Sequence, residues 1–287
     1  MNTKEIQKRI KGIKNTKQIT KAMEMVAASK MRKACMRVLA IKPYARLAWE
    51  MLNNLSGRVN VELHPLLQER EIKKIGVILI TSDRGLCGAM NTQVIQKAIK
   101  IVEKANAIRP ENMEVEFITV GKKGRDFIKK YYKIFAEFTG LEGVSNIMEI
   151  TSIVKIAIED YEKGLYDKIV LVYTNFISTL KQEPMVRQLL PIESKKQESI
   201  DEQFEYKFEP TPDKVLKELL PRLLEIQIYQ ALLESNASEH CARMVAMKNA
   251  TDAAKDLIDD LSMIFNQTRQ ANITQEIIEI STGAQFV

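Results

Sequence analysis

The sequence predicts a compact α/β domain attached to a long antiparallel, left-handed coiled coil that the two ends of the chain form together. Three observations predict this fold class: a helical repeat over residues 211–281, a helical pattern over about residues 3–56, and alternating strand and helix patterns between them. We expect three parts: an N-terminal coiled-coil helix over 1–58, an α/β domain over 73–192 and a C-terminal coiled-coil helix over 211–287.

The C-terminal helix is predicted by a repeat that alternates steps of three and four residues. Such steps keep one face of a helix toward a partner helix and are typical of a left-handed coiled coil. At ~1.5 Å per residue this helix is about 105 Å long, too long for its own domain to bury, so it must pair with another helix and project into a further partner. The repeat consists of Leu216, Leu219, Leu223, Ile226, Gln230, Leu233, Ala237, His240, Met244, Met247, Thr251, Ala254, Ile258, Leu261, Phe265, Thr268, Asn272 and Gln275.

The first helix supplies the partner. Its apolar residues recur at spacings typical of one helix face: Ile6, Ile10, Ile13, Ile19, Met23 and Val26. Proline lacks an amide donor and clashes with the preceding turn. We therefore expect Pro43 to kink or interrupt the first helix, and Pro221 to bend the last helix or make it restart.

The middle of the chain alternates strands with helices. Strands are predicted at 75–81, 115–120, 134–138 and 168–176, with an edge strand at 185–191, and helices at 90–106, 125–132 and 146–163. The run IGVILIT is continuously apolar, as in a strand covered on both faces. This alternation predicts an α/β sheet with helices on its faces.

The loop SDRGLCG, residues 82–88, follows the first strand and offers Asp83, Arg84 and Cys87. No phosphate-binding motif of the G-x-x-x-x-G-K-[ST] or G-x-G-x-x-G type supports a nucleotide site here. A cysteine nucleophile needs a nearby base, and both histidines, His64 and His240, lie outside the α/β segment. We interpret the loop as a tight turn or a contact loop, and we expect no catalytic site and no cofactor.

Charge is concentrated at the start of the chain. Residues 1–58 hold fourteen Lys or Arg against three Glu, a net charge of +11, whereas the whole chain has +6. A basic helix binds nucleic acid, anionic lipid or an acidic protein surface. Aromatic residues are absent from the first forty-three positions, which argues against base stacking. The sequence has no transmembrane run, no secretory signal, and three widely spaced cysteines that favour a reducing cytoplasm.

Three blocks of the sequence resemble the gamma subunit of F-type ATP synthases, in its bacterial form. They are NTKQITKAMEMVAASKMRKA ending at Ala34, TSDRGLCGAMN over 81–91, and ASEHCARMVAMKNATDAA followed by RQANITQEIIEISTGA over 237–284. The resemblance implies an antiparallel coiled coil with a Rossmann-like α/β domain at its base. It also implies a non-catalytic rotor that turns with a membrane ring of c subunits and drives ATP synthesis in the beta subunits.

The resemblance further implies partners and contact residues. The partners are the alpha and beta subunits, the epsilon subunit and the c ring, with no nucleic acid. Membrane association is indirect, at the cytoplasmic face of the bacterial membrane. Beta-subunit contacts fall on Met23, Lys30, Arg32, Lys33, Arg269, Gln270, Thr274 and Glu276. A possible contact loop close by offers Asp83, Arg84 and Cys87. Contacts with the c ring or the epsilon subunit fall on Tyr206, Phe208 and Glu209. The apolar end Phe286-Val287 favours contact at the tip of the rod.

Two other functions remain as alternatives. A basic coiled coil that binds nucleic acid or a membrane surface predicts affinity that falls steeply with salt. An α/β enzyme that uses Cys87 predicts loss of activity on Cys87→Ser. The rotor explains both ends of the chain, which neither alternative does.

Overall fold

The computed structural model describes residues 3–56, 64–68, 70–108, 113–143, 146–179, 181–192 and 211–284. Internal contacts divide the chain into two compact units. The first combines Met1–Ala28 with Arg243–Val287, and the second comprises Ser29–Ala242. Within the described part of the chain, no helix is both long enough and apolar enough to cross a membrane.

The second unit contains a five-stranded sheet in the order β3-β2-β1-β4-β5. Strands β1 to β4 pair in parallel, and β5 joins β4 antiparallel at the edge. This strand order, with helices on both faces, is that of a doubly wound Rossmann-like fold, and it confirms the predicted α/β domain. The strands are β1 (Lys74–Ile80), β2 (Glu114–Val120), β3 (Ile134–Phe138), β4 (Lys168–Phe176) and β5 (Gln182–Leu190).

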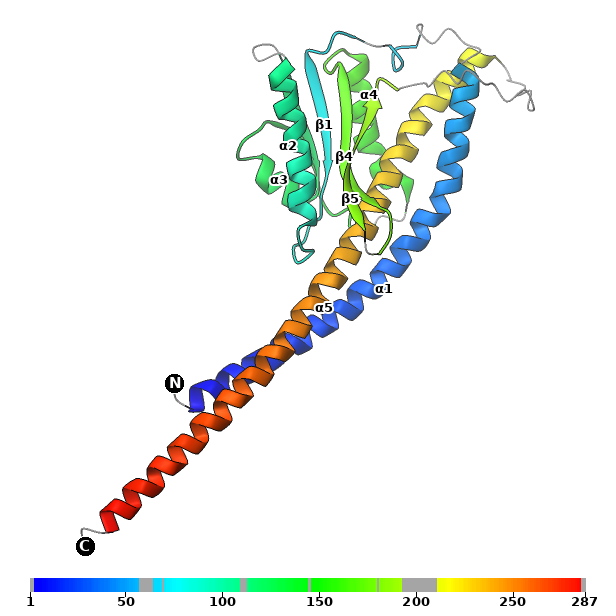
Figure 1. Ribbon diagram of the computed structural model, residues 1–287. Helices are drawn as coiled ribbons and strands as arrows, with labels where there is room; N and C mark the ends of the chain where they lie inside the picture. The colour runs from blue at the N-terminus through cyan, green and yellow to red at the C-terminus, as the bar shows by residue number, and fades with distance from the viewer. Residues whose placement is uncertain are drawn as a thin grey trace. The chain divides into compact units, whose positions relative to one another are not determined.

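Both faces of the sheet are covered, which explains why β1 is apolar throughout. Val77 and Leu79 face the core formed with helix α2 (Met90–Ile108), whereas Ile78 and Ile80 belong to the core on the opposite face. That second core includes α4 (Thr151–Glu162), on the other side of the sheet from α2 in Figure 1. Successive strand residues point to opposite faces, so a strand buried on both sides reads as a continuous apolar run.

The predicted elements agree with the structure except at their ends. The predicted helix over 146–163 opens as a 3₁₀ turn, Ile147–Ile150, which Asn146 caps with its side chain before α4 begins. The predicted helix over 125–132 is α3 (Lys122–Ile128), which begins earlier because the chain turns into it at Gly121. Strand β5 starts at Gln182 and includes Pro184, as an edge strand can tolerate.

The terminal helices are α1 (Thr3–Ser56) and α5 (Pro212–Ala284), and each continues through its proline. The expected interruption at Pro43 and restart after Pro221 are therefore wrong. An interior proline costs about 3 kcal/mol, whereas burying one leucine side chain contributes about 1.5–3 kcal/mol. Leu220, Leu223 and Leu224 around Pro221 are all buried in the core, and their burial offsets that cost.

The two helices pair in an antiparallel direction. In the second unit, Ala34 and Val38 of α1 pack against Ala237 and Leu233 of α5, so rising numbers on one helix meet falling numbers on the other. In the first unit the hydroxyl groups of Thr20 and Thr251 are 2.8 Å apart.

The predicted repeat on α5 matches burial along the helix. Every repeat position from Leu216 to Thr268 is buried or half-buried, and only Asn272 and Gln275 are exposed. The helices are antiparallel, so moving forward along α5 from Thr251 corresponds to moving backward along α1 from Thr20 by the same number of residues. Thr268 therefore lies opposite Thr3, the first residue of α1. The repeat therefore loses its cover where α1 begins.

The face predicted for α1 is partly wrong. Ile6 is fully buried, but Ile19 and Val26 are 60% and 56% exposed. Steps of four and three from Ile13 lead to Thr20 and Ala27 instead, and both of these are covered. The structure thus favours small residues on α1, which allow two helices to approach closely, over the larger residues beside them.

Candidate functional site

The loop after β1 is held by hydrogen bonds among Ser82, Cys87 and Asn91. The side-chain amide of Asn91 donates to Ser82 Oγ at 2.7 Å and to Cys87 Sγ at 3.2 Å, while its oxygen accepts from the Ser82 amide at 3.1 Å. Cys87 is buried, and Leu86 adopts a left-handed conformation with φ 64° that closes the turn. Cys87 therefore has a structural contact, as expected for a tight turn.

Asp83 ties this loop to its two neighbours at the carboxyl end of the sheet. Its Oδ1 accepts from the amide of Lys122 at 3.0 Å, and its Oδ2 accepts from the amide of Gly140 at 2.8 Å. Gly121 lies so close to the first loop that a Cβ would be 2.2 Å from the carbonyl oxygen of Thr81. The three loops that follow β1, β2 and β3 are therefore held against one another.

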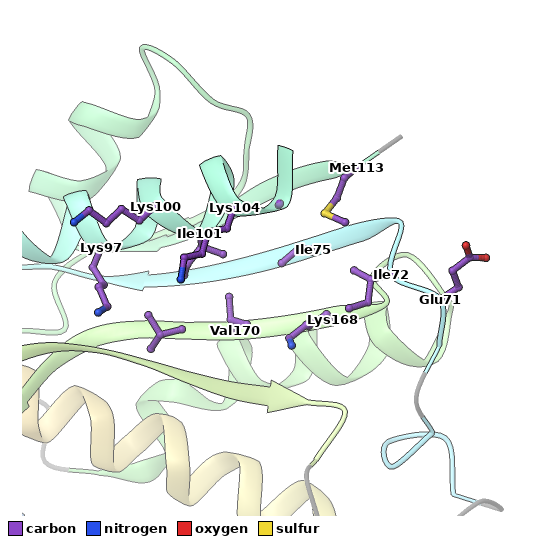
Figure 2. Close-up of a pocket in the computed structure, with 12 residues that line it drawn as sticks. Glu71, Ile72, Ile75, Lys97, Lys100, Ile101, Lys104, Met113, Lys168 and Val170 are labelled. Atoms are coloured by element: carbon purple, nitrogen blue, oxygen red, sulfur yellow. The ribbon is translucent and has the colours of Figure 1, made fainter. Parts of the chain in front are cut away.

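Little space remains at this end of the sheet, although open α/β sheets commonly bind ligands there. The cavity lined by Thr81, Asp83, Gly121 and neighbouring residues has a volume of 10 Å³, about the space of one water molecule. A much larger cavity, of 750 Å³, lies toward the other end of the sheet (Figure 2). The loop that offers the most reactive side chains is thus not the place with room for a ligand.

Two residues predicted as contacts meet on a third side chain, that of Glu142. Lys30 of α1 lies 3.0 Å from one carboxylate oxygen of Glu142, and Arg84 lies 3.4 Å from the other. The guanidinium of Arg37 also donates to the carbonyl of Gly143 at 3.0 Å. These contacts join α1 to the loop over 140–143 and bring Lys30 close to the loop over 82–88.

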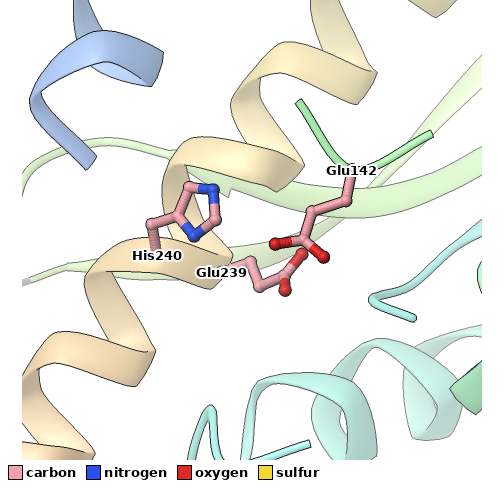
Figure 3. Close-up of side chains that lie close together, drawn as sticks. All are labelled: Glu142, Glu239 and His240. Atoms are coloured by element: carbon pink, nitrogen blue, oxygen red, sulfur yellow. The ribbon is translucent and has the colours of Figure 1, made fainter. Parts of the chain in front are cut away.

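Glu142 also lies beside Glu239 and His240 of α5, as Figure 3 shows. One ligand atom from each of these three residues lies within 4.8 Å of the others, a spacing that could hold a metal ion. Lys30 and Arg84, however, already occupy both oxygens of Glu142. We therefore interpret the cluster as a charged junction between α1, α5 and the loop over 140–143.

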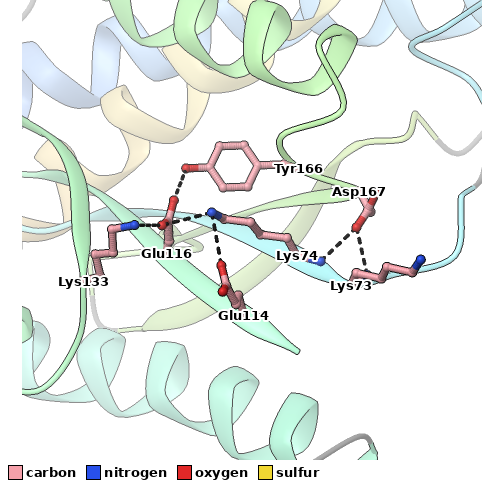
Figure 4. Close-up of polar contacts among 7 residues, drawn as sticks. All are labelled: Lys73, Lys74, Glu114, Glu116, Lys133, Tyr166 and Asp167. Carbon is pink, nitrogen blue, oxygen red and sulfur yellow. Dashed lines mark hydrogen bonds and ion pairs between the residues drawn. The ribbon is translucent and has the colours of Figure 1, made fainter. Parts of the chain in front are cut away.

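A second charged cluster lies at the start of the strands and is centred on Glu116 (Figure 4). The Glu116 carboxylate accepts hydrogen bonds from Lys133, from Lys74 at 3.0 Å and from the Tyr166 hydroxyl at 2.8 Å. Burial raises the pKa of Glu116, but hydrogen bonds from the two lysines and the tyrosine outweigh it, so the pKa lies below its ordinary value. The carboxylate is charged and paired, which is typical of a structural role.

Comparisons with known proteins identify the family of this chain. A family model described as ATP synthase matches residues 2–287. The ATP synthase gamma chain of Roseiflexus sp. (strain RS-1) is 43% identical over 286 residues, which cover 99% of this chain and 97% of the relative. That of Pelotomaculum thermopropionicum is 45% identical over 282 residues, covering 98% and 97%. This chain belongs to the ATP synthase gamma-chain family.

Solved structures share the fold. A chain of the Euglena gracilis mitochondrial ATP synthase rotor matches with a TM-score of 0.66 and 19% identity, covering 94% of this chain and 98% of that one. A chain of the Tetrahymena thermophila central stalk and c ring matches with a TM-score of 0.60 and 22% identity, covering 81% and 99%.

As a gamma chain, the protein is a non-catalytic central-stalk subunit of a rotary ATP synthase. Catalysis in this enzyme belongs to the beta subunits, so the structural role of Cys87 is what membership predicts. The alternative of a basic coiled coil for nucleic acid or membrane surfaces is not favoured.

Of the remaining predicted contact residues, those that the structure describes lie on the two long helices. Met23 is half-buried on α1, where Arg32 and Lys33 are exposed. The residues predicted on α5 are all exposed near its end: Arg269, Gln270, Thr274 and Glu276. Tyr206, Phe208, Glu209 and Phe286-Val287 lie outside the described residues.

Sequence reasoning missed a set of exposed apolar side chains on the same helices. On α1 they include Met25, Met36, Leu39 and Leu47, and on α5 they include Ile273, Ile277 and Ile280. For α5 the signal was available in the sequence, because these isoleucines fall outside the repeat that runs along that helix. An apolar side chain off the seam of a coiled coil indicates a further contact.

Proposed function

We propose that this chain transmits rotation from a membrane ring of c subunits to the catalytic beta subunits, where it drives ATP synthesis from ADP and phosphate. Two solved structures that share the fold, a mitochondrial ATP synthase rotor and a central stalk with its c ring, support this proposal. The chain would lie at the cytoplasmic face of the bacterial membrane, attached through the c ring and beside the epsilon subunit.

The exposed end of α5 carries the proposal. Residues 269–282 are all exposed, and Ile273, Ile277 and Ile280 lie at helical spacing on one face. Their exposed fractions are 47%, 61% and 73%, so each side chain leaves a large apolar surface in contact with water in the isolated chain. Burying one such side chain contributes about 1.5–3 kcal/mol, so the helix end would be stabilised inside an apolar protein surface that surrounds it. The alpha and beta subunits of the hexameric ring would form that surface.

The polar residues beside this stripe would contact the loops of the beta subunits. Arg269, Gln270, Thr274 and Glu276 are exposed on the same stretch of α5 and are free to form hydrogen bonds with such loops. Removal of one uncharged hydrogen bond costs about 0.5–1.5 kcal/mol. These contacts would therefore adjust coupling, whereas the isoleucines would hold the rod in the ring.

The basic surface of α1 supplies a second contact. Arg32 and Lys33 are exposed in the same helix as Lys30, and Met36 and Leu39 provide apolar surface beside them. An acidic segment of the beta subunits would fit this combination, with Asp83 holding the loop that carries Arg84 in place. A single exposed ion pair contributes less than about 1 kcal/mol, so the apolar contacts would provide most of the affinity.

Reconstitution tests the proposal. Alpha and beta subunits from the same source are purified and assayed for ATP hydrolysis and for rotation of a bead on α5, with and without the full chain. We expect stable assembly and rotation in fixed steps that depend on adding the chain. If the subunits do not associate with the chain and hydrolysis does not change, the proposal is wrong.

A further inference from the structure

The 750 Å³ cavity lies between α2 and the sheet, toward the starts of the parallel strands (Figure 2). Ile75, Val170 and Val186 line its sheet side, and Ile101 lines its helix side. Ligand cavities commonly measure about 300–1,000 Å³ and have mostly apolar walls. The cavity thus has the size and the surface of a small-molecule site.

Four lysines surround this apolar surface. Lys97, Lys100 and Lys104 come from one face of α2, and Lys168 comes from the start of β4 on the other side. Within the part of the lining that the structure describes, Glu71 is the acidic residue. Among the described residues, none of these four ammonium groups has an ion pair or a hydrogen bond, whereas nearby Lys74 pairs with Glu114 and Glu116. The cavity therefore has an excess of unpaired positive charge.

This arrangement has a cost in the free protein. Lysines three and four residues apart on a helix repel each other. Their long stems can cover the apolar wall while the ammonium groups reach water, but this does not remove the repulsion. An anion bound among them would remove it.

The walls also indicate which anion fits. Among the described residues, the lining contains no aromatic side chain on which a base could stack and no glycine-rich turn that could hold a phosphate chain. Its apolar members are aliphatic side chains and the thioether of Met113. A flexible alkyl chain matches such walls better than a nucleotide does.

We propose that this cavity binds an amphiphile through its phosphate or carboxylate head and one of its alkyl chains. The head lies among Lys97, Lys100, Lys104 and Lys168, and the alkyl chain lies against Val170 and Val186. The proposal does not depend on the rotor function, because all of these residues belong to the second unit and lie outside the contacts assigned above.

Calorimetry on the full chain tests the proposal with decyl phosphate and decanoate below their micelle concentrations. Decyl maltoside has the same alkyl chain without charge, and inorganic phosphate has the charge without the chain. We expect the two amphiphilic anions to bind at least tenfold more tightly than either control. The double variant Lys100→Glu/Lys104→Glu should weaken their binding at least tenfold, whereas Lys129→Glu/Lys130→Glu, with the same charge change on exposed residues away from the cavity, should change it less than twofold.

Methyl NMR locates the ligand, and we expect decyl phosphate to shift the methyl signals of Val170, Val186 and Ile101. Equal binding of decyl maltoside or of inorganic phosphate would overturn the proposal, as would equal weakening by the two double variants. Unchanged methyl signals at these three residues would also overturn it. The variant Lys100→Gln/Lys104→Gln, which removes charge without adding any, should weaken binding too, and this separates loss of attraction from the repulsion that glutamate adds.

Vesicle flotation distinguishes the source of the ligand. Vesicles of phosphatidylcholine are compared with and without phosphatidylglycerol. Flotation that needs phosphatidylglycerol, Lys100 and Lys104 assigns the site to a membrane lipid, and binding of decyl phosphate without flotation assigns it to a free amphiphile. If a partner subunit shields the same methyl groups in the assembled complex and the free chain binds neither anion, the cavity is a subunit interface and the proposal is wrong.

Discussion

Asp83→Ala is the substitution that most directly tests how the carboxyl end of the sheet is held. Each carboxylate oxygen of Asp83 accepts one backbone hydrogen bond, from Lys122 and from Gly140. A hydrogen bond to a charged group contributes about 1.5–3 kcal/mol, and partial exposure of Asp83 places each bond at the lower end. We therefore expect the free energy of unfolding to fall by about 2–4 kcal/mol.

Urea denaturation of the full chain, followed by circular dichroism, measures this change. Asp126→Ala is the matched control, because among the described residues exposed Asp126 pairs with half-buried Arg125 alone and should contribute less than about 1 kcal/mol. Asp83→Asn keeps one acceptor oxygen and should lie between the two. Amide exchange should accelerate at Lys122 and Gly140 in Asp83→Ala. If Asp83→Ala and Asp126→Ala destabilise equally and exchange at both amides is unchanged, the carboxylate does not hold these loops together.

Three further predictions concern buried charge, a buried amide and the exposed end of α5. The pKa of Glu116 is depressed in the folded protein, so its pairing stabilises the fold above the ordinary pKa of about 4.3, and this stabilisation is lost as the pH falls through the lower folded value. The free energy of unfolding of Glu116→Gln should therefore be about 1–3 kcal/mol lower at pH 7. In a pH series of thermal melts, the melting temperature of this variant should fall less steeply toward acid pH than that of the wild type. Gln227 is buried, and within the described structure neither the nitrogen nor the oxygen of its side-chain amide has a hydrogen-bond partner. Gln227→Leu should therefore raise the free energy of unfolding, measured by denaturant titration, by about 1–3 kcal/mol. A lower free energy of unfolding would refute this prediction. Ile273→Lys/Ile277→Lys should change the melting temperature of the isolated chain by less than about 2 °C, because both side chains are exposed. In reconstituted vesicles the same double variant should uncouple rotation from ATP synthesis. Synthesis at the wild-type rate would contradict the proposed contact.

Much of the fold could be predicted because local periodicity determines it. The repeat on α5 follows burial from Leu216 to Thr268, since the steps of three and four select the face that meets α1. The apolar run of β1 correctly indicated a strand covered on both faces. The restart expected after Pro221 was wrong for the opposite reason, because the burial of Leu220, Leu223 and Leu224 is a tertiary effect that proline chemistry alone does not reveal.

The candidate site was less predictable, because its pairings depend on loops distant in sequence. The contact of Lys30 with Glu142 joins residues more than a hundred positions apart, and no spacing pattern indicates it. The role of Asp83 was hidden for the same reason, since its partners are backbone amides of the loops after β2 and β3. The sequence predicted that the loop over 82–88 is a tight turn or a contact loop, but it could not identify which parts of the chain this loop holds together.

The charged junction around Glu142 links these observations to rotation. Lys30 belongs to α1, Glu239 and His240 belong to α5, and Arg84 and Glu142 belong to loops of the α/β domain. Within the second unit the junction therefore joins both helices to the sheet by charged side chains. If torque enters through this domain, it must reach the helix pair through such contacts and through the apolar core that α5 shares with α4. Because Lys30 and Arg84 remain partly exposed, salt screens their ion pairs, whereas the apolar core is unaffected, so the core must carry most of the load.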